Sequence, residues 1–271
     1  TVVKAFADAP AAKAGVKNGD IIYKVKGKEV TGVDINNVVT EMKGEKGTTV
    51  DITVYRESEK KYIDFTITRD QVNEPTVEYK MLDKKKKIGY IQISQFEEVT
   101  YDQFTKALDD LKKQGMKAVI FDVRSNPGGL YETVCKMLDE ILPEGNLVST
   151  KDKYGNEEKQ TSDSKCLEMP MVVLQNKDSA SASEIFAGAI QDFNAGKIVG
   201  TQSFGKGIVQ TILPLSDGSA VKLTVQDYYT PSGKNIHGKG ITPDVEAELE
   251  ENATSDTQLE KAKETIMELM K

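Results

Sequence analysis

The pattern of hydrophobic and polar positions divides this chain into two regions. In the first 70 residues, short segments of alternating polarity predict strands, and two further segments predict helices. The longer helix has apolar residues at positions 35, 38, 39 and 42, which share one helix face. We therefore expect a small mixed domain with strands over 1–6, 21–25, 50–55 and 62–67, helices over 9–15 and 35–43, and a hairpin turn at 56–61.

Beyond residue 76 the predicted strands are more apolar, and helices separate them. Residues 118–123 and 172–174 are nearly continuous apolar runs, which are typical of strands covered on both faces of a parallel sheet. The alternation predicts an α/β core with right-handed crossovers. The expected elements are strands over 88–93, 118–123, 172–174 and from 197, helices over 100–114, up to 142, over 183–193 and over 257–270, a lysine-rich hairpin turn at 84–87 and a polar loop over 150–164.

The composition excludes several classes of protein. Of the 271 residues, 38% are hydrophobic and 29% are charged, and no run approaches the ~18 consecutive apolar residues of a membrane span. Acidic side chains outnumber basic ones by 43 to 36, giving a net charge of −7, which argues against a global nucleic-acid-binding surface. We therefore expect no nucleic-acid partner and no integral membrane span.

The histidine and cysteine content excludes the common metal sites. His237 is the only histidine, so a multi-histidine metal site within one chain is impossible. The two cysteines, Cys135 and Cys166, form no CxxC pair, which rules out a zinc knuckle and leaves open one disulfide or two free thiols. Since no nucleotide or coenzyme A signature is visible either, we expect neither a metal nor a cofactor.

The first stretch with candidate chemistry is RSNPGG, Arg124–Gly129, immediately after the apolar strand that ends at Val123. Paired glycines let the backbone turn its N–H groups toward a ligand. The carboxyl end of a parallel strand is also where α/β proteins place their sites. A plain strand-to-helix turn would explain the same residues, so this stretch alone does not establish a site.

The second stretch is NKDSASASE, Asn176–Glu184, which again follows an apolar strand. Small residues cluster there where a strand becomes a helix. A serine on such a turn can be exposed beside the free N–H groups and the positive potential of the helix N-terminus. Simple capping is the alternative, with Ser181 or Ser183 as the cap and Glu184 in the first turn.

The third stretch is SFGKGIVQ, Ser203–Gln210. A lysine between two glycines is unusual for a surface lysine, which needs no such backbone freedom. If the segment is extended, Lys206, Ile208 and Gln210 share one face, because side chains alternate along a strand. The glutamine could then hold the lysine in place.

Together the three stretches describe a site for acyl transfer. Ser181 would attack a carbonyl carbon, and Lys206 would act as the base once burial lowers its pKa from the usual ~10.4. Gln210 would orient the lysine without adding charge. The Ala182 N–H and one N–H of Gly128–Gly129 would form the oxyanion hole.

A serine–histidine triad that uses His237 is the rival arrangement. The residues around this histidine, KNIHGKG, are polar and rich in glycine. Such a setting predicts a surface turn rather than a catalytic base.

The chain resembles the carboxyl-terminal processing peptidases, also called tail-specific proteases, over essentially its whole length. That family combines a PDZ domain, an NPGG-type turn, a serine in an SASASE-like stretch and a lysine in an SFGKG-like stretch. The family lysine follows the nucleophile by 25 residues, and a glutamine follows four residues later. The same spacing selects Ser181, Lys206 and Gln210 here, and the segments 228–233 and 238–244 match as well.

The resemblance implies a fold and a domain order. The fold is an α/β protease core of ββα units, like that of crotonase and ClpP, joined to a mixed α+β PDZ domain. The family's carboxylate-binding glycine loop precedes the strand expected at 1–6 and is not in this sequence, so the PDZ domain is expected to lack its N-terminal part. The expected parts are the PDZ domain over 1–70, a linker over 71–75, the serine peptidase core over 76–250 and a C-terminal helix over 251–271.

The resemblance also implies an activity. A serine endopeptidase of this family cleaves protein or peptide substrates near exposed C-termini, and its PDZ domain binds the substrate tail and gates the site. The implied location is extracytoplasmic, reached through an N-terminal signal or anchor that this sequence does not contain. Relatives often self-associate, so a homo-oligomer is expected.

Two other functions compete with this interpretation. A catalytically silent homologue could use the same fold and PDZ domain only to bind peptides or lipids, although the joint presence of Ser181, Lys206 and Gln210 argues against it. A crotonase-like enzyme also directs glycine N–H groups at oxyanions, but a PDZ domain would be out of place in it.

Overall fold

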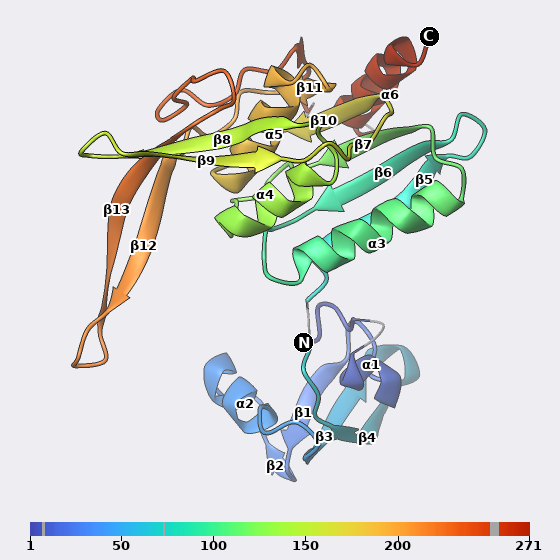
Figure 1. Ribbon diagram of the computed structural model, residues 1–271. Coiled ribbons are helices and arrows are strands. Elements are labelled where there is room, and N and C mark those ends of the chain that lie inside the picture. Colours follow the sequence, from blue (N-terminus) through green and yellow to red (C-terminus); the bar gives the residue numbers. More distant parts are fainter. Residues whose placement is uncertain (7–8, 73, 250–254) are drawn as a thin grey trace. The chain divides into compact units, whose positions relative to one another are not determined.

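The computed structural model describes four stretches of the chain, residues 1–6, 9–72, 74–249 and 255–271 (Figure 1). They fall into two compact units, Thr1–Pro75 and Thr76–Lys271, which we call the first and second unit. Both units combine helices with strands, as predicted for an α/β core and a smaller mixed domain. No helix in these stretches is long and apolar enough to cross a membrane.

The first unit contains a four-stranded antiparallel sheet with the order β2-β1-β3-β4. Its interior is made by apolar side chains of β1, β3 and β4, as the alternating pattern predicts. The elements are helices α1 (Pro10–Ala14) and α2 (Ile35–Met42), strands β1 (Ile21–Val25), β2 (Lys28–Glu29), β3 (Thr49–Arg56) and β4 (Lys61–Thr68), and the short 3₁₀ helix η1 (Glu57–Glu59).

One expected strand of the first unit, over residues 1–6, is wrong. Only Val2 forms ladder-like backbone bonds there: its N–H donates to Asp20 O and its carbonyl accepts from Gly19 N, both at 2.8 Å. Val3 lies in a bend and the rest of residues 1–6 is irregular, so these bonds do not continue into a ladder.

The second unit is organised around a six-stranded sheet. Every neighbouring pair is parallel except the edge strand β5, which is antiparallel to β6. The order across the sheet is β14 (Val245–Glu246), β11 (Gly196–Gly200), β10 (Met171–Gln175), β7 (Ala118–Asp122), β6 (Ile88–Ile93) and β5 (Val77–Asp83).

Helices cover both faces of this sheet, which explains the continuous apolar strands. Along β7, Val119 and Phe121 pack into the larger core on one face, and Ala118 and Ile120 pack into the smaller core on the other. The larger core lies beneath α3 (Thr100–Lys113), α4 (Tyr131–Asp139) and α5 (Ala182–Asp192), and the smaller one beneath α6 (Thr257–Leu269) (Figure 1).

A second, antiparallel sheet adjoins the helices of this unit. The polar loop expected over 150–164 is wrong, because most of it belongs to the hairpin of β8 and β9. The sequence of β9, EEKQTS, is exposed except at its last residue, so it has no apolar face for the pattern to show. The order is β12 (Ile208–Pro214), β13 (Ala220–Tyr229), β8 (Gly145–Asp152) and β9 (Glu157–Ser162).

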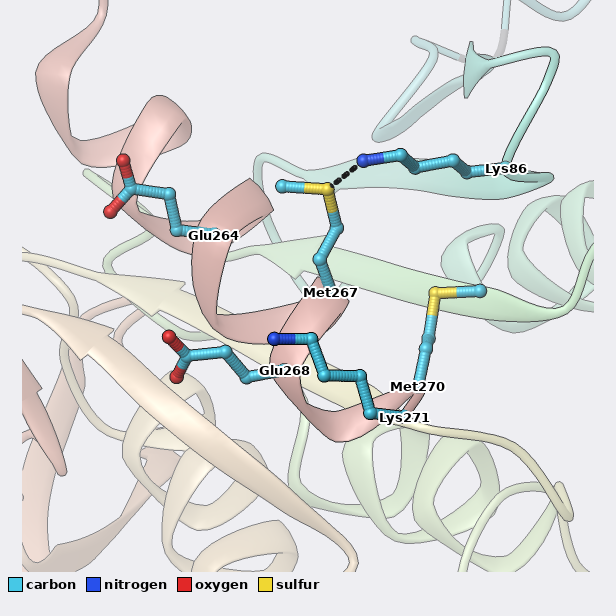
Figure 2. Close-up of a pocket in the computed structure, with 6 residues that line it drawn as sticks. All are labelled: Lys86, Glu264, Met267, Glu268, Met270 and Lys271. Atoms are coloured by element: carbon cyan, nitrogen blue, oxygen red, sulfur yellow. Dashed lines mark hydrogen bonds between the residues drawn. The ribbon is translucent and has the colours of Figure 1, made fainter.

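The C-terminal end of α6 borders a surface pocket of about 420 Å³ (Figure 2). Lys86, in the predicted hairpin turn between β5 and β6, donates a hydrogen bond from its ammonium group to the sulfur of Met267 there. No residue of the three candidate stretches lines this pocket. The other lining residues are Glu264, Glu268, Met270 and Lys271.

Candidate active site

The turn after β7 is held by the side chain of Asn126, which is completely buried. Its Nδ2 donates to Ile93 O and its Oδ1 accepts from Gly128 N, both at 2.8 Å. Gly128 has a φ of +103°, and a Cβ there would lie 2.8 Å from the Cβ of Ser181. The turn therefore needs glycine because it passes in direct contact with the serine.

The structure separates the three serines of the second stretch. Ser179 and Ser183 are buried, and their hydroxyls donate to Val123 O at 2.8 Å and to Asn126 O at 2.9 Å. Ser181 is half-buried and lines a cleft. Of the three, it is the serine that a ligand in the cleft can reach.

Ser181 also has an unusual backbone conformation. Its φ of +57° and ψ of −116° form a combination that non-glycine residues rarely adopt, and such strain is found most often at functional sites. The residue immediately precedes α5, so free N–H groups and the positive end of the helix lie beside it. This environment favours negative charge next to the serine.

Lys206 lies in a loop whose flanking glycines let another loop pack closely. A Cβ on Gly205 would lie 3.0 Å from Lys239 N, and one on Gly207 would lie 2.6 Å from His237 N. The absence of side chains at the two glycines therefore allows the second loop to approach closely. The packing of that loop fixes the backbone on both sides of the lysine. The side chain of Lys206 is half-buried and lines the same cleft as Ser181.

Glu184, completely buried in the first turn of α5, connects these two segments. Its Oε2 accepts hydrogen bonds from Ser181 N and Lys206 N, both at 2.8 Å. Its Oε1 accepts from Ser203 Oγ at 2.6 Å and from Gly205 N at 2.7 Å. Four hydrogen bonds compensate the burial of this carboxylate, which thereby fixes the serine backbone relative to the lysine backbone.

Tyr228 of β13 makes a second connection between the same residues. Its hydroxyl is shared between Lys206 O, at 2.6 Å, and Ser181 O, at 3.0 Å. Burial, and after it the negative charge of Glu184, raises the pKa of Tyr228 well above its ordinary value, so the hydroxyl stays protonated and able to donate. We call Glu184 and Tyr228 the clasp.

The sequence pattern identifies neither clasp residue as functional. It explains Glu184 as a capping residue, and the carboxylate does accept from the Ser181 N–H. Its other partners, however, come from a segment about 20 residues further along the chain, which no local pattern shows. For Tyr228, the family match over 228–233 is the one signal that points to its neighbourhood.

A cleft of about 360 Å³ brings the predicted catalytic residues together. Ser181, Lys206 and Gln210 all line it. Within the described residues no hydrogen bond joins Ser181 Oγ to Lys206 Nζ, and Gln210 Nε2 lies 3.4 Å from Thr224 Oγ1 rather than bonding to the lysine. The other lining residues are Pro127, Gly129, Leu130, Tyr131, Ala182, Ile185, Ile208, Val209, Ile212, Lys222 and Tyr228.

Two backbone N–H groups at the cleft are available to a ligand. Gly129 and Ala182 both line the cleft. Neither backbone N–H donates a hydrogen bond to an acceptor in the described part of the chain. The N–H of Gly128, in contrast, donates to Asn126 Oδ1. Of the two glycines expected at the oxyanion hole, Gly129 is the one with the free donor.

Arg124 anchors the start of the NPGG turn to the C-terminal helix. Its guanidinium contacts Asp122 at the end of β7, with Nη2 2.6 Å from Oδ2. The same group forms two bonds to Asp256, from Nη1 at 2.9 Å and from Nη2 at 2.8 Å. Asp256 also caps α6 by accepting from Leu259 N. The helix and the turn are therefore joined by one ionic network.

His237 lies outside the cleft. Its side chain is exposed, and its backbone N donates to Asn235 Oδ1 within a turn, as the polar sequence predicts. Cys135 and Cys166 are both free thiols, and burial raises the pKa of Cys135 to about 12. No group of three or more His, Cys, Asp or Glu among the described residues is arranged to hold a metal ion. That the protein works without metal or cofactor stays a prediction.

Solved structures of proteases share this fold. The photosystem II D1 C-terminal processing protease is 32% identical, with a TM-score of 0.61 that covers 98% of this chain and 72% of that one. A putative S41 protease from Bacteroides fragilis, only 18% identical, covers 99% of this chain and 78% of that one with a TM-score of 0.64. The fold is therefore that of a protease core of the C-terminal processing class.

The family models agree with these structures. Residues 87–247 match the model of peptidase family S41, and residues 1–67 match that of the PDZ domain. The chain therefore belongs to peptidase family S41, and the predicted resemblance to the carboxyl-terminal processing peptidases is confirmed.

Curated relatives are similar over most of this chain. A carboxy-terminal-processing protease of Bartonella bacilliformis is 42% identical over 91% of the chain. A probable CtpA-like serine protease of Staphylococcus aureus is 40% identical over 87% of it. The matched region makes up 58% and 47% of these two relatives, so the chain spans about half of their length.

Proposed function

We propose that this protein is a serine endopeptidase, with Ser181 as the nucleophile and Lys206 as the general base, that cleaves protein substrates near their C-termini. One observation carries the proposal. Ser181, unlike Ser179 and Ser183, shares a single cleft with Lys206 and with two backbone N–H groups that have no acceptor in the described stretches. These are the components that acyl transfer requires.

The chemistry follows from their roles. Ser181 Oγ attacks the scissile carbonyl carbon while its proton passes to Lys206 Nζ. The tetrahedral oxyanion accepts hydrogen bonds from the N–H groups of Gly129 and Ala182. When the C–N bond breaks, the leaving amine takes the proton from Lys206, and the acyl group stays on the serine as an ester.

Water completes the cycle by the same route in reverse. Lys206 takes a proton from water, whose oxygen attacks the ester carbonyl carbon. The ester C–O bond then breaks, the serine recovers the proton, and the new carboxyl terminus leaves. Gln210 has the supporting role of orienting the Lys206 side chain as the substrate binds, since catalytic hydrogen bonds often form only in the complex.

Tail recognition is assigned to the first unit. It contains a groove of about 620 Å³ beside α2, a helix that buries none of its own residues. The groove is largely apolar, with Ile22, Val39 and Met42 among its lining residues, and Lys43 and Arg69 add positive charge. Such a surface suits an apolar peptide that ends in a carboxylate.

Gating by the PDZ domain is part of the same proposal. A small unit on a short connection can move as a rigid body, and a ligand that favours one arrangement shifts the population toward it. We expect peptides with identical cleavage sites to be cut more slowly when the C-terminus is amidated than when it is free. Equal rates would refute both tail capture and gating.

The extracytoplasmic location and the homo-oligomer that the resemblance implies stay predictions. Fractionation of cells that produce the protein tests the first, and light scattering of the purified protein tests the second.

Loss of the nucleophile or the base tests the proposed activity. Ser181→Ala and Lys206→Ala should each lower kcat/KM for peptide hydrolysis by at least ~10³-fold while the circular dichroism spectrum is unchanged. Lys206→Arg should fail as well, because a guanidinium group does not give up its proton. An active Ser181→Ala variant would contradict the assignment. Absence of any hydrolysis or sulfonyl fluoride labelling in the wild type would instead indicate a silent binding homologue.

A further inference from the structure

The cleft differs in charge from the chain as a whole. The protein has a net charge of −7, yet the charged side chains that line the cleft are two lysines, Lys206 and Lys222. No aspartate or glutamate among the described residues lines it. Glu184, which holds the catalytic backbones together, is completely buried, and both of its carboxylate oxygens already accept hydrogen bonds. A bound peptide therefore meets positive charge that no side chain lining the cleft neutralises.

Lys222 lies on β13, in the hairpin that extends away from the six-stranded sheet (Figure 1). The register pairs Lys222 with Ile212, and Thr224 with Gln210. Directly opposite residues of an antiparallel pair project from the same face, and Ile212 and Gln210 both line the cleft. Lys222 therefore lies on the cleft-facing side of the hairpin, about 7 Å along the strand from the pair that contains Gln210.

The ammonium group of Lys222 has no carboxylate partner in the described stretches. The side chain is exposed, and no ion pair joins it to an acidic residue there. The hairpin contains two acids. Asp217, at its turn, accepts hydrogen bonds from the N–H and the hydroxyl of Ser219, and Asp227 does not line the cleft. The charge of Lys222 is therefore available to a ligand in the cleft.

We infer that Lys222 determines specificity by binding a carboxylate of the substrate about two residues from the scissile bond, since a peptide in the cleft covers ~7 Å with about two residues. The inference rests on the proposed peptidase function and names its substrate class, which is polypeptide with an acidic group near the cleavage site. A polypeptide carries carboxylates on Asp and Glu side chains and at its C-terminus. The same ammonium group repels a lysine or arginine at that position, so it discriminates in both directions.

A charge-swap series tests the role of Lys222. Peptides that differ only in having Glu, Gln or Lys at one position are compared, and the position is varied on both sides of the scissile bond. At one position we expect wild-type kcat/KM to be about threefold higher for Glu than for Gln and about threefold lower for Lys. Lys222→Glu should invert this order, and Lys222→Gln should bring the three peptides within about twofold of one another.

Lys153→Glu is the matched control. Lys153 is exposed in the turn between β8 and β9 and does not line the cleft, so the variant changes the net charge of the protein by the same amount. We expect its ratio of kcat/KM for the Glu and Lys peptides to stay close to that of the wild type. An equal shift of this ratio in both charge-reversed variants would assign the preference to the field of the whole protein and overturn the role of Lys222.

Blocking the C-terminus distinguishes the two sources of the carboxylate. A preference for Glu in amidated peptides places the carboxylate on a side chain. Faster cleavage of a free than of an amidated peptide that has no acidic residue and ends two residues after the scissile bond places it at the C-terminus. Either effect must disappear in Lys222→Gln, which leaves the groove beside α2 intact and so separates this effect from tail capture. Neither effect in the wild type would overturn the inference.

Labelling of Ser181 by an uncharged sulfonyl fluoride separates this inference from the proposed function. The same Glu-to-Lys ratio in the wild type and in Lys222→Glu, with Ser181 labelled in both, would overturn the role of Lys222 and leave the peptidase intact. Absence of both labelling and cleavage in the wild type would overturn the proposed function itself.

Discussion

The base of the cleft and the hairpin that leads away from it are built in opposite ways. At the base, the backbones of Ser181 and Lys206 are held by Glu184 and Tyr228, side chains that are at most 1% exposed and fully hydrogen-bonded. On the hairpin of β12 and β13, one strand edge is open. Its large apolar side chains are 39–66% exposed, among them those of Ile212, Leu213, Val221 and Leu223.

The contrast follows from what each region has to do. Reacting groups must be held close to one productive geometry, and buried hydrogen-bonded side chains provide that rigidity. A surface that binds varied polypeptides must instead present main-chain hydrogen-bonding groups and exposed apolar side chains that do not require one particular substrate conformation. Changes at the base should therefore alter turnover, and changes on the hairpin should alter the use of long substrates.

Glu184→Gln should have the largest effect of the changes that spare Ser181 and Lys206. An amide NH₂ would replace one carboxylate oxygen and face two donors, so two buried hydrogen bonds are lost. We expect kcat to fall by about 10²-fold, with a loss of ~1–3 kcal/mol in the free energy of unfolding. Steady-state kinetics and urea unfolding measure the two quantities. A change in KM with kcat unaffected would show that the carboxylate does not position the reacting residues.

Tyr228→Phe should have a smaller effect of the same kind. The variant keeps the buried ring but loses the hydroxyl shared by Ser181 O and Lys206 O. We expect kcat to fall by about tenfold, because the loss of roughly one buried hydrogen bond is worth ~1 kcal/mol and loosens both backbones. Sulfonyl fluoride labelling should slow by a similar factor. An unchanged labelling rate would assign the tyrosine to the fold alone.

Gln210→Ala should reduce kcat by about three- to tenfold, because this side chain orients the lysine without exchanging a proton. His237→Ala is the matched control, since His237 is exposed and outside the cleft, and should leave kcat/KM within twofold. A large loss of activity in the histidine variant would favour the triad in place of the lysine. The two variants are compared on the same peptide.

The network behind the NPGG turn should show the smallest effect and a defined pH dependence. Burial acts to raise the pKa of Asp256, but hydrogen bonds, chiefly from Arg124, hold it below the ordinary 3.8. Because the folded-state pKa is lower than the unfolded one, the carboxylate stabilises the fold above its ordinary pKa. That contribution is lost as the pH falls through the folded-state value.

Asp256→Asn measures this contribution. We expect a loss of ~0.5–1 kcal/mol in the free energy of unfolding at pH 7, since the pair is partly exposed to solvent, and a fall in kcat of about twofold. The difference from the wild type should be the same at pH 5 and should shrink below pH 3.8. A difference that stays constant down to pH 2.5 would show that the ion pair with Arg124 is not its cause.

Much of the fold could be predicted because apolar side chains repeat with the period of each element. The strand over 88–93 and the lysine-rich turn before it lie where the pattern places them, and the helix expected over 183–193 occupies Ala182–Asp192. Strand β9 could not be predicted in this way, since its residues are polar and, apart from Ser162, exposed, so they show no such period. The strand expected over 1–6 has an apolar beginning but no partner strand for a ladder.

The site could be predicted in part for a similar reason. Ser181, Lys206 and Gln210 lie in short motifs with fixed spacing, and the structure places all three on one cleft. The roles of Glu184 and Tyr228 depend on contacts between segments about 20 and 47 residues apart, which no local pattern encodes. The sequence also leaves two glycines for the oxyanion hole, and only the turn geometry shows that the N–H of Gly128 is already bonded.

Active-site labelling tests the assignment of Ser181 as nucleophile and Lys206 as base. The purified protein is treated with a sulfonyl fluoride, and peptide mass spectrometry identifies the modified residue in the wild type, Lys206→Ala and His237→Ala. We expect modification of Ser181 in the wild type and the histidine variant, and its loss in the lysine variant at the same pH. Modification of a different serine, or equal labelling of Ser181 without Lys206, would contradict the serine–lysine site.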